Sequence, residues 1–475
     1  MKAIMKVAAV GLVVLLATAG GASAQVNLQK YVALGDSLTA GYASAGLAEY
    51  YQAHSYPAIL AQQFGMASFA QPTVSDPGIP AVLKLTALNI TSQGVSPVIV
   101  TTPGQGSPTN ATYQGIYNNL GIPGANTSDL LTKTGNIMNL VNGTSTASTV
   151  FYDLVLRDGT NPAINQAIGA KGTFYTVWIG NNDVLGAVLS GIAMDGVTLT
   201  TVADFTQSYQ TLLGALHSGA PAARIMVGNI PDVLAIPFIT TIKPYLVNPA
   251  NGSHIPLIGA NGLLTENDYV TLGAAQLIAQ GIGVPAAAGG TGQPLPEGTI
   301  DAEGLHAGVV LRADEVALIR QRTTELNAVI AQTASAMGAV LFDVNSLFND
   351  IAAHGKIVGG VDLTAAFLTG GLFSYDGVHP QRLGYAVVAN EMIKRMNLAF
   401  GSRVPEVDLN AYLNGTVAAT STGAAKTIFT LDAYRSLLKV MAPQVLTDSL
   451  AVRRPVRRTI QRSEEAPARS LALRH

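Results

Sequence analysis

The 475-residue sequence predicts an α/β fold with a mostly parallel central sheet. Short apolar runs, several of which end at glycine, alternate along the chain with longer stretches of helical periodicity. This alternation is expected of a parallel sheet that helices cover on both faces. Apolar residues (AVILMFWYC) also make up 48% of the chain, which is enough to bury a large core. General disorder is therefore excluded.

Four apolar runs have the length and composition of buried strands. They are residues 31–34, 174–179, 223–227 and 339–343. Helical spacing of apolar residues predicts helices at 56–64, 204–217, 267–280, 312–337 and 380–396. Two Pro- and Gly-rich stretches, about 65–118 and 235–305, interrupt the alternation, and we expect loop insertions there. Such insertions either cover the functional site or pack as plain surface.

The first 24 residues have the pattern of an export signal. Lys2 and Lys6 precede an apolar run over residues 7–17, and the small residues Ala22 and Ala24 follow it. This order is typical of a secretory signal peptide, and the apolar run is too short to span a membrane. We expect cleavage after Ala24, export to the periplasm or the cell exterior, and no transmembrane span in the mature chain.

Charge and cysteine content exclude several classes of protein. The formal net charge is only −2, so nucleic acid is not an expected partner. The chain has no cysteine, which excludes disulfides, cysteine-ligated metals and a cysteine nucleophile. We expect the main folded domain over 25–402 and a C-terminal extension over 403–475. Its last 30 residues carry seven Arg and predict a flexible basic tail, with weak contact to an anionic surface as the alternative.

Four short blocks of polar residues and glycine lie where a parallel sheet collects reactive groups, next to the carboxyl ends of predicted strands. They are GDSL at 35–38, NLGIPG at 119–124, GNND at 180–183 and DGVH at 376–379. Each block alone is equally typical of a helix cap or a turn. All four in this order supply the parts of an acyl-transfer site.

The chemistry of acyl transfer assigns a role to each block. Ser37 is the candidate nucleophile, because a serine hydroxyl next to a base can attack a carbonyl. His379 is the candidate base, and Asp376, three residues earlier, can orient its ring. The backbone N–H groups of Ser37 and Gly124 and the amide of Asn182 are candidate donors to the developing oxyanion. Gly121 in the same block is a rival for Gly124.

These blocks resemble those of the GDSL, or SGNH, family of serine esterases and lipases, from residue 31 to about 397. The resemblance implies a flavodoxin-like three-layer α/β/α sandwich, the SGNH hydrolase fold. It also implies hydrolysis of carboxylic esters without a metal or an organic cofactor. In this chain the family's triad would be Ser37, Asp376 and His379, and its oxyanion hole would be formed by Ser37, Gly124 and Asn182.

Three functional hypotheses follow. The first is a secreted serine hydrolase that cleaves lipid or short-acyl esters, so that its partner is a small-molecule or lipid ester. The second is an O-acetylesterase that acts on extracellular polysaccharide. The third is a non-catalytic binding protein on a hydrolase fold. The first is favoured over the second because the chain has a single Trp, Trp178, which lies in a predicted core strand rather than on a sugar-binding surface.

Overall fold

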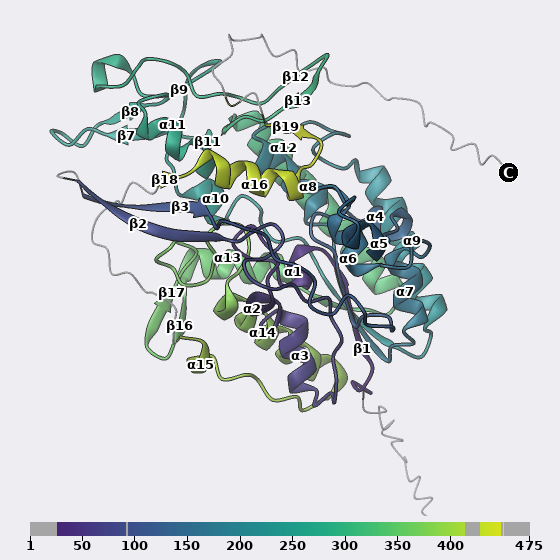
Figure 1. Cartoon of the computed structure of the whole chain (residues 1–475). Coiled ribbons are helices and arrows are strands. Elements are labelled where there is room, and N and C mark those ends of the chain that lie inside the picture. Colours follow the sequence, from purple (N-terminus) through teal and green to yellow (C-terminus); the bar gives the residue numbers. More distant parts are fainter. Residues whose placement is uncertain (1–25, 92–93, 414–427, 448–449, 451–475) are drawn as a thin grey trace, which may run out of the picture.

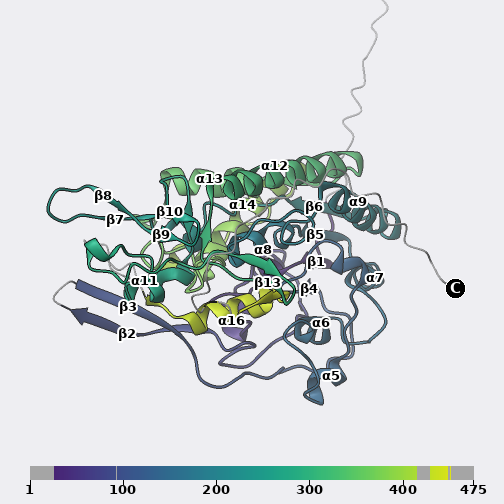
Figure 2. The same cartoon turned by 90° about the horizontal axis from the view of Figure 1, so that it is seen from above.

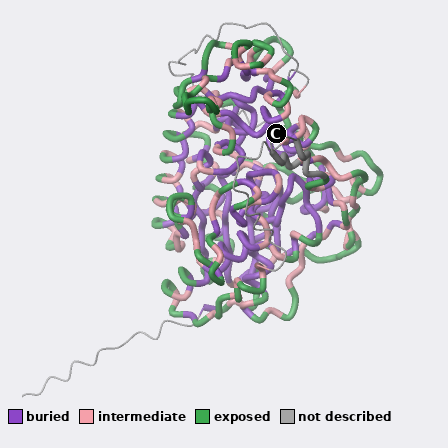
Figure 3. Tube along the Cα trace, turned by 90° about the vertical axis from the view of Figure 1, so that its left-hand side faces the viewer, coloured by how far each residue is buried: buried purple, intermediate pink, exposed green. Residues whose placement is uncertain are grey.

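The computed structural model describes the chain except for residues 1–25, 92–93, 414–427, 448–449 and 451–475 (Figure 1). The expected signal peptide and most of the expected basic tail therefore lie outside the described residues. The remaining chain folds around a buried core with an exposed rim (Figure 3). Among the described residues, every helix is too short or too polar to cross a bilayer.

The core of the fold is a five-stranded parallel sheet with the order β15-β6-β5-β1-β4. The strands are β1 (Tyr31–Gly35), β4 (Asn119–Gly121), β5 (Phe174–Trp178), β6 (Arg224–Gly228) and β15 (Val340–Phe342). This is the flavodoxin-like order, in which the winding reverses between β1 and β5. The predicted α/β class and the three-layer sandwich are confirmed.

Side chains of the sheet alternate between two helical layers, as the period of two in a strand requires. On one face, Tyr31, Ala33 and Trp178 pack with α3 (Tyr56–Gln63) and α14 (Arg382–Phe400). On the other, Val32 and Leu34 belong to the main core with the second layer of helices. That layer contains α7 (Ala163–Gly169), α8 (Asn182–Ser190), α9 (Val202–Gly219) and α12 (Ala313–Ala336), and Figure 2 shows α9 beside α12.

Most of the predicted helices are present, and local sequence explains their ends. The helix α3 begins after Ser55, whose hydroxyl accepts a hydrogen bond from the Ala58 N–H, and Pro57 occupies its first turn. The helix predicted over 267–280 is wrong in extent. Tyr269–Val270 forms strand β11, which pairs with β14 (Val310–Leu311), and only η1 (Leu272–Ala274) and α11 (Ala275–Ala279) are helical.

The sequence predicted a loop for the first insertion, but the structure contains regular strands there. It contains a hairpin of β2 (Leu83–Thr91) and β3 (Gly94–Thr101), which projects from one side of the molecule (Figure 1). The register of the pair shifts between Leu85 and Ala87. Such a bulge breaks the alternation of side chains along a strand, so the period of two is hidden in the sequence.

The C-terminal extension also contributes ordered elements. Strand β18 (Ile428–Phe429) pairs with β3, helix α16 (Leu431–Met441) follows, and β19 (Val445–Leu446) pairs with β13 (Gly304–His306). Figure 1 shows α16, in yellow, between the hairpin and α8. Both insertions and the extension therefore pack together on the main domain.

The remaining elements connect and flank this frame. The helices are α1 (Ser37–Ala40), α2 (Glu49–Gln52), α4 (Asp129–Thr132), α5 (Ile137–Val141), α6 (Val150–Val155), α10 (Pro237–Thr240), α13 (Val344–His354), α15 (Asn410–Leu413) and the 3₁₀ turn η2 (Ala286–Ala288). The strands are β7 (Tyr245–Val247), β8 (His254–Pro256), β9 (Ile258–Gly259), β10 (Gly262–Leu263), β12 (Thr299–Asp301), β16 (Lys356–Val358) and β17 (Val361–Leu363).

Candidate active site

The first block forms the turn between β1 and α1. Asp36 caps the helix, because its carboxylate accepts a hydrogen bond of 3.0 Å from the Leu38 N–H. The cap is therefore not Ser37, which is the first residue of α1 and is only 3% exposed. The Ser37 hydroxyl does not cap the N-terminus of the helix and therefore remains available for another contact.

That contact is with the last block. Ser37 Oγ lies 3.0 Å from His379 Nε2, although the two residues are 342 positions apart in the sequence. The other ring nitrogen, His379 Nδ1, lies 2.9 Å from Asp376 Oδ2. All three side chains are buried. The structure thus brings together the three residues that the sequence predicted as nucleophile, base and orienting acid, in one hydrogen-bonded chain.

The Asp376 carboxylate accepts hydrogen bonds at both oxygens. Oδ1 accepts from the backbone N–H groups of Val378 and His379, each at 2.8 Å, and from the Ser374 hydroxyl at 3.1 Å. Oδ2 accepts from the His379 ring and from the Ala45 N–H at 2.8 Å. Burial alone would raise the pKa of Asp376, but the charge of His379 and these donors outweigh it and hold the pKa below its usual value. The carboxylate therefore stays ionised beside the imidazole.

Three candidate donors to an oxyanion come from three different strand ends. The backbone N–H groups of Ser37 and Gly124 make no hydrogen bond within the described part of the chain. Asn182, at the start of α8, donates one Nδ2 proton to the Ala125 carbonyl at 2.7 Å. This bond ties the amide to the loop that carries Gly124 and leaves its second Nδ2 proton free to donate.

The two glycines of the second block differ in their surroundings. The N–H of Gly121 is used, because it donates to Asn119 Oδ1 at 3.0 Å, and the residue is packed in β4 against the backbone of Thr39 and Ala40. Gly124 follows the strand with a φ of +80°, a conformation that favours glycine. Of the two, only Gly124 offers a free backbone donor.

Two further aspartates, Asp36 and Asp183, connect the blocks through hydrogen bonds. Asn181 donates to Asp36 at 2.7 Å, and Asp183 accepts hydrogen bonds from the Thr127 N–H at 3.0 Å and the Thr127 hydroxyl at 2.9 Å. Burial raises the pKa of both Asp36 and Asp183 to about 6, in spite of these donors. Asp183 thus connects the end of β5 to the loop of Gly124.

Sequence reasoning missed several residues around the imidazole. The ring of Tyr42 lies 4.9 Å from the His379 ring, centre to centre, and its buried hydroxyl has no partner among the described residues. Burial and the charge of Asp376 raise the pKa of Tyr42 well above its ordinary value. Ser374 and Ala45, which hold Asp376, were also missed, because no local pattern distinguishes them.

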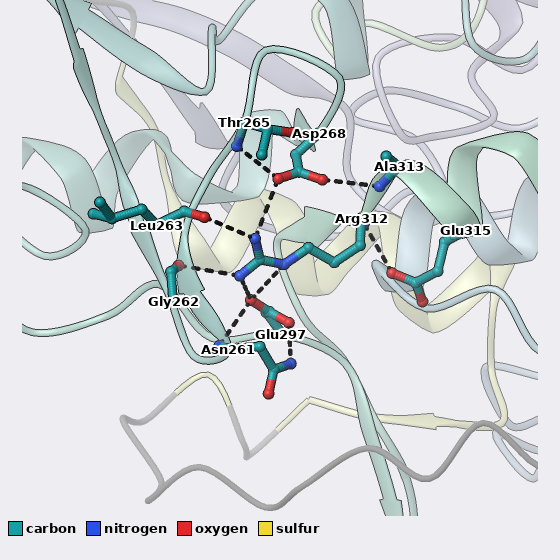
Figure 4. A network of polar contacts seen from close by, with 9 residues as sticks. All are labelled: Asn261, Gly262, Leu263, Thr265, Asp268, Glu297, Arg312, Ala313 and Glu315. Atoms are coloured by element: carbon teal, nitrogen blue, oxygen red, sulfur yellow. Dashed lines mark hydrogen bonds and ion pairs between the residues drawn. The ribbon is translucent and has the colours of Figure 1, made fainter.

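The second insertion supports the histidine turn. The Phe238 N–H donates to the Gly377 carbonyl at 2.8 Å, and Leu272 lies against the same glycine. Arg312, at the start of α12, holds this insertion in place (Figure 4). Its guanidinium contacts Glu297 at 2.5 Å and Asp268 at 3.1 Å, and both carboxylates are almost fully buried. It also donates to two carbonyls of the insertion, those of Gly262 and Leu263.

Within the described residues, one group of side chains has the spacing of a metal site. It consists of Asp301, Glu303 and His306 in the β12–β13 hairpin. His306 Nε2 already contacts Asp301 at 2.8 Å, and Asp301 also accepts from the backbone of its own turn. Both acids are exposed, so the hairpin needs no ion to account for this arrangement.

Comparison with known proteins shows the family of the chain. The family model described as GDSL-like Lipase/Acylhydrolase matches residues 31–392, and no curated protein matches the chain. Similar solved structures include an extracellular lipase from Streptomyces rimosus (17% identity, 78% of this chain and 98% of that chain, TM-score 0.31). Another is an acetyl-xylooligosaccharide esterase variant from a Geobacillus species (12% identity, 79% and 96%, TM-score 0.32). A third is phospholipase A1 from Streptomyces albidoflavus (15% identity, 78% and 98%, TM-score 0.30). The chain is thus a carboxylic ester hydrolase that belongs to the GDSL-like lipase/acylhydrolase family.

Proposed function

We propose that this hydrolase acts through an acyl-enzyme on Ser37, with His379 as general base and acid and Asp376 as the group that orients the imidazole. The observation that carries the proposal is the unbroken hydrogen-bonded chain of 3.0 Å and 2.9 Å from Ser37 to Asp376. In the first step His379 Nε2 takes the Ser37 proton as Oγ attacks the ester carbonyl. The same proton then passes to the departing alcohol, and the acyl group stays on Ser37.

The second half of the reaction uses the same residues. His379 removes a proton from water, the resulting hydroxyl attacks the acyl-enzyme, and the proton returns to Ser37 Oγ as the carboxylic acid leaves. Both tetrahedral intermediates carry an oxyanion, for which the N–H groups of Ser37 and Gly124 and the free Nδ2 proton of Asn182 are the donors. The free state of these donors supports this assignment, because a donor committed to the protein could not bind the oxyanion.

We propose lipid or short-acyl esters as substrates. Trp178 is fully buried and donates its indole N–H to the Asn229 carbonyl at 3.1 Å, so it is not a platform for stacking on sugar rings. This favours an acyl or lipid ester over an acetylated polysaccharide. We further propose that the protein is exported and that Ala24 precedes the mature N-terminus, which the mass of the secreted protein would test.

The test is hydrolysis of 4-nitrophenyl esters from acetate to palmitate by the 25–475 chain, with Ser37→Ala beside it. Serine-dependent release of nitrophenolate is expected, and the acyl length with the highest kcat/KM identifies the preferred chain. Asn182→Ala should lower kcat by about 10²–10³. Turnover by Ser37→Ala at more than a few per cent of the wild-type rate would refute Ser37 as nucleophile.

A further inference from the structure

A cleft outside the hydrogen-bonded chain is lined by residues that pack against segments of the site. Its volume is about 350 Å³, and it is bounded by the outer face of α16, the start of α6 and the segments around Pro80 and Thr101. Two cations of α16, Arg435 and Lys439, line it together with Asp432 and neutral residues. The cleft is therefore built partly from the C-terminal extension.

Each wall of this cleft adjoins a segment that holds a residue of the site. Val440 lies on the α16 wall, and its carbonyl oxygen would be 2.5 Å from a Cβ atom placed at Gly124. Val150, on the second wall, precedes Phe151, whose ring packs against that of Tyr42 beside the imidazole.

Pro80, on the third wall, packs against Gly46, the neighbour of the Ala45 N–H that donates to Asp376. Three separate contacts thus lead from the cleft to the three parts of the catalytic centre.

The charges of the cleft favour an anion. Arg435 and Lys439 are four residues apart on one helix, so their side chains extend over the same face. Asp432 contacts Arg435 at 3.1 Å, but it is 83% exposed, and exposed pairs of this kind are weak in water. Lys439 makes no ion pair with any described residue. The cleft is therefore left with a net positive charge.

This positive charge stands out against the rest of the chain. Residues 25–445 carry 18 basic and 26 acidic side chains, so the body of the protein is acidic. Two like charges at this spacing also destabilise a helix. Among the described residues, no ion pair of Lys439 offsets this repulsion. Binding of an anion between the two cations would do so.

We propose that the cleft is a subsite for an anionic group, a carboxylate or a phosphate, carried by the ester substrate, and that Lys439 and Arg435 bind it. The proposal rests on the ester hydrolysis proposed above and adds a substrate class to it. The neutral part of the ester lies at Ser37, and the charged group lies over α16. Lys439 and Arg435 are then specificity residues rather than catalytic ones.

Matched pairs of esters test this proposal. Mono-4-nitrophenyl adipate is compared with 4-nitrophenyl hexanoate for a charge on the acyl side. Acetyl glycerol phosphate is compared with acetyl glycerol for a charge on the alcohol side. For each pair the measured quantity is the ratio of kcat/KM for the anionic ester to that for the neutral ester, in wild type, Lys439→Gln, the double variant Lys439→Gln/Arg435→Gln, and Arg320→Gln as the control.

Arg320 is an exposed cation of α12 that does not line the cleft. Its replacement by Gln changes the net charge by the same amount as Lys439→Gln. We expect the ratio to fall on the order of tenfold in Lys439→Gln for at least one pair, and further in the double variant, with no change in Arg320→Gln. Raising the salt concentration from 0.05 to 0.5 M should reduce the same ratio in wild type. A ratio in the double variant within twofold of wild type for both pairs would overturn the proposal.

A binding measurement separates this proposal from the proposed reaction. Ser37→Ala, which cannot form the acyl-enzyme, should bind mono-4-nitrophenyl adipate or acetyl glycerol phosphate about tenfold more tightly than Ser37→Ala/Lys439→Gln does. That result supports the subsite even if the wild-type protein hydrolyses none of the four esters, in which case only the proposed reaction fails. Equal affinity of the two variants for both anionic esters would refute the subsite.

Discussion

Replacement of Asp376 by Asn is the sharpest test of how the imidazole is held. The two side chains have nearly the same shape, but an amide has one oxygen where the carboxylate has two. The oxygen can stand at the Oδ1 position, where it keeps the donors Val378 N–H, His379 N–H and the Ser374 hydroxyl. It can instead stand at Oδ2, where it keeps the His379 ring and the Ala45 N–H.

The first orientation leaves one backbone N–H, that of Ala45, facing an NH₂ group. The second leaves two, those of Val378 and His379. Because an unsatisfied buried donor costs about 1–3 kcal/mol, the first orientation is favoured by about that amount, which is about 5- to 150-fold in population. The NH₂ group then faces His379 Nδ1 and can only donate to it. The ring must carry its proton on Nε2, where it can no longer accept the proton of Ser37.

We therefore expect Asp376→Asn to lower kcat/KM by about 10⁴ while the protein stays folded. The assay is hydrolysis of the best 4-nitrophenyl ester, with circular dichroism and urea unfolding to establish that the fold is kept. The control is Asp153→Asn. Asp153 is also buried and accepts three hydrogen bonds, from Asn136 N–H, Asn139 Nδ2 and the Ser145 hydroxyl, but it contacts no histidine.

A loss of less than tenfold in Asp376→Asn would refute the reasoning, because it would mean that the tautomer of His379 does not depend on Asp376. A loss of equal size in Asp153→Asn would also refute it, since the effect would then follow from any buried aspartate. In the first case the catalytic base would have to be held by another group.

Three further predictions concern the frame of the site. Arg312→Ala leaves two buried carboxylates without their cation and should lower the free energy of unfolding by about 3–5 kcal/mol, measured with urea. Asp183→Asn mimics the protonated acid. Burial raises the pKa of Asp183 from 3.8 to about 6, so the folded state binds this proton more tightly than the unfolded state does. The stability contributed by this group is therefore fully present below pH 3.8 and is lost as the pH rises through 6. The variant should match wild type near pH 4 and exceed its stability at pH 7.5 by about 3 kcal/mol. A chain ending at residue 402 should be insoluble or inactive, whereas one ending at 450, which keeps the buried Leu450, should keep wild-type activity.

Each of these predictions has a contradicting outcome. A loss below about 1 kcal/mol in Arg312→Ala would mean that the buried carboxylates find other partners. A stability difference between Asp183→Asn and wild type that does not change with pH would show that Asp183 does not titrate in this range. Full activity of the 25–402 chain would show that α16 is dispensable for the site.

The sequence predicted the centre of the site because reactive residues in a parallel sheet follow strand ends, which are easy to recognise. Ser37 and Asn182 follow β1 and β5, the two strands between which the winding reverses. His379 and Asp376 lie three residues apart, so their contact is local. The alternation of strands and helices predicts only a parallel sheet, and the flavodoxin-like order that brings these groups to one edge was implied by the resemblance to the GDSL family.

The surroundings of the centre depend on contacts that no local pattern records. Ala45 reaches Asp376 across 331 residues, and the ring of Tyr42 lies beside that of His379 although the two residues are far apart in the sequence. The choice between Gly121 and Gly124 also needed the structure, because it depends on whether each N–H already has an acceptor. Periodicity predicts which residues are buried, but not which buried donor is left free.

The C-terminal extension shows how a weak sequence signal can conceal a structural role. In α16 the residues Tyr434, Leu437, Leu438, Val440 and Met441 are buried. At about 2 kcal/mol for each side chain, their burial contributes up to about 10 kcal/mol, an upper estimate because unfolded chains already bury part of this surface. Whole domains are stable by about 5–15 kcal/mol, so loss of this helix would cancel most of the margin. The Val440 carbonyl of this helix also packs against Gly124. The Tyr434 hydroxyl donates to the carbonyls of Leu189 and Gly308. The same contacts that stabilise the domain therefore hold the loop of Gly124, the proposed oxyanion donor. Truncation before α16 should for this reason remove fold and activity together.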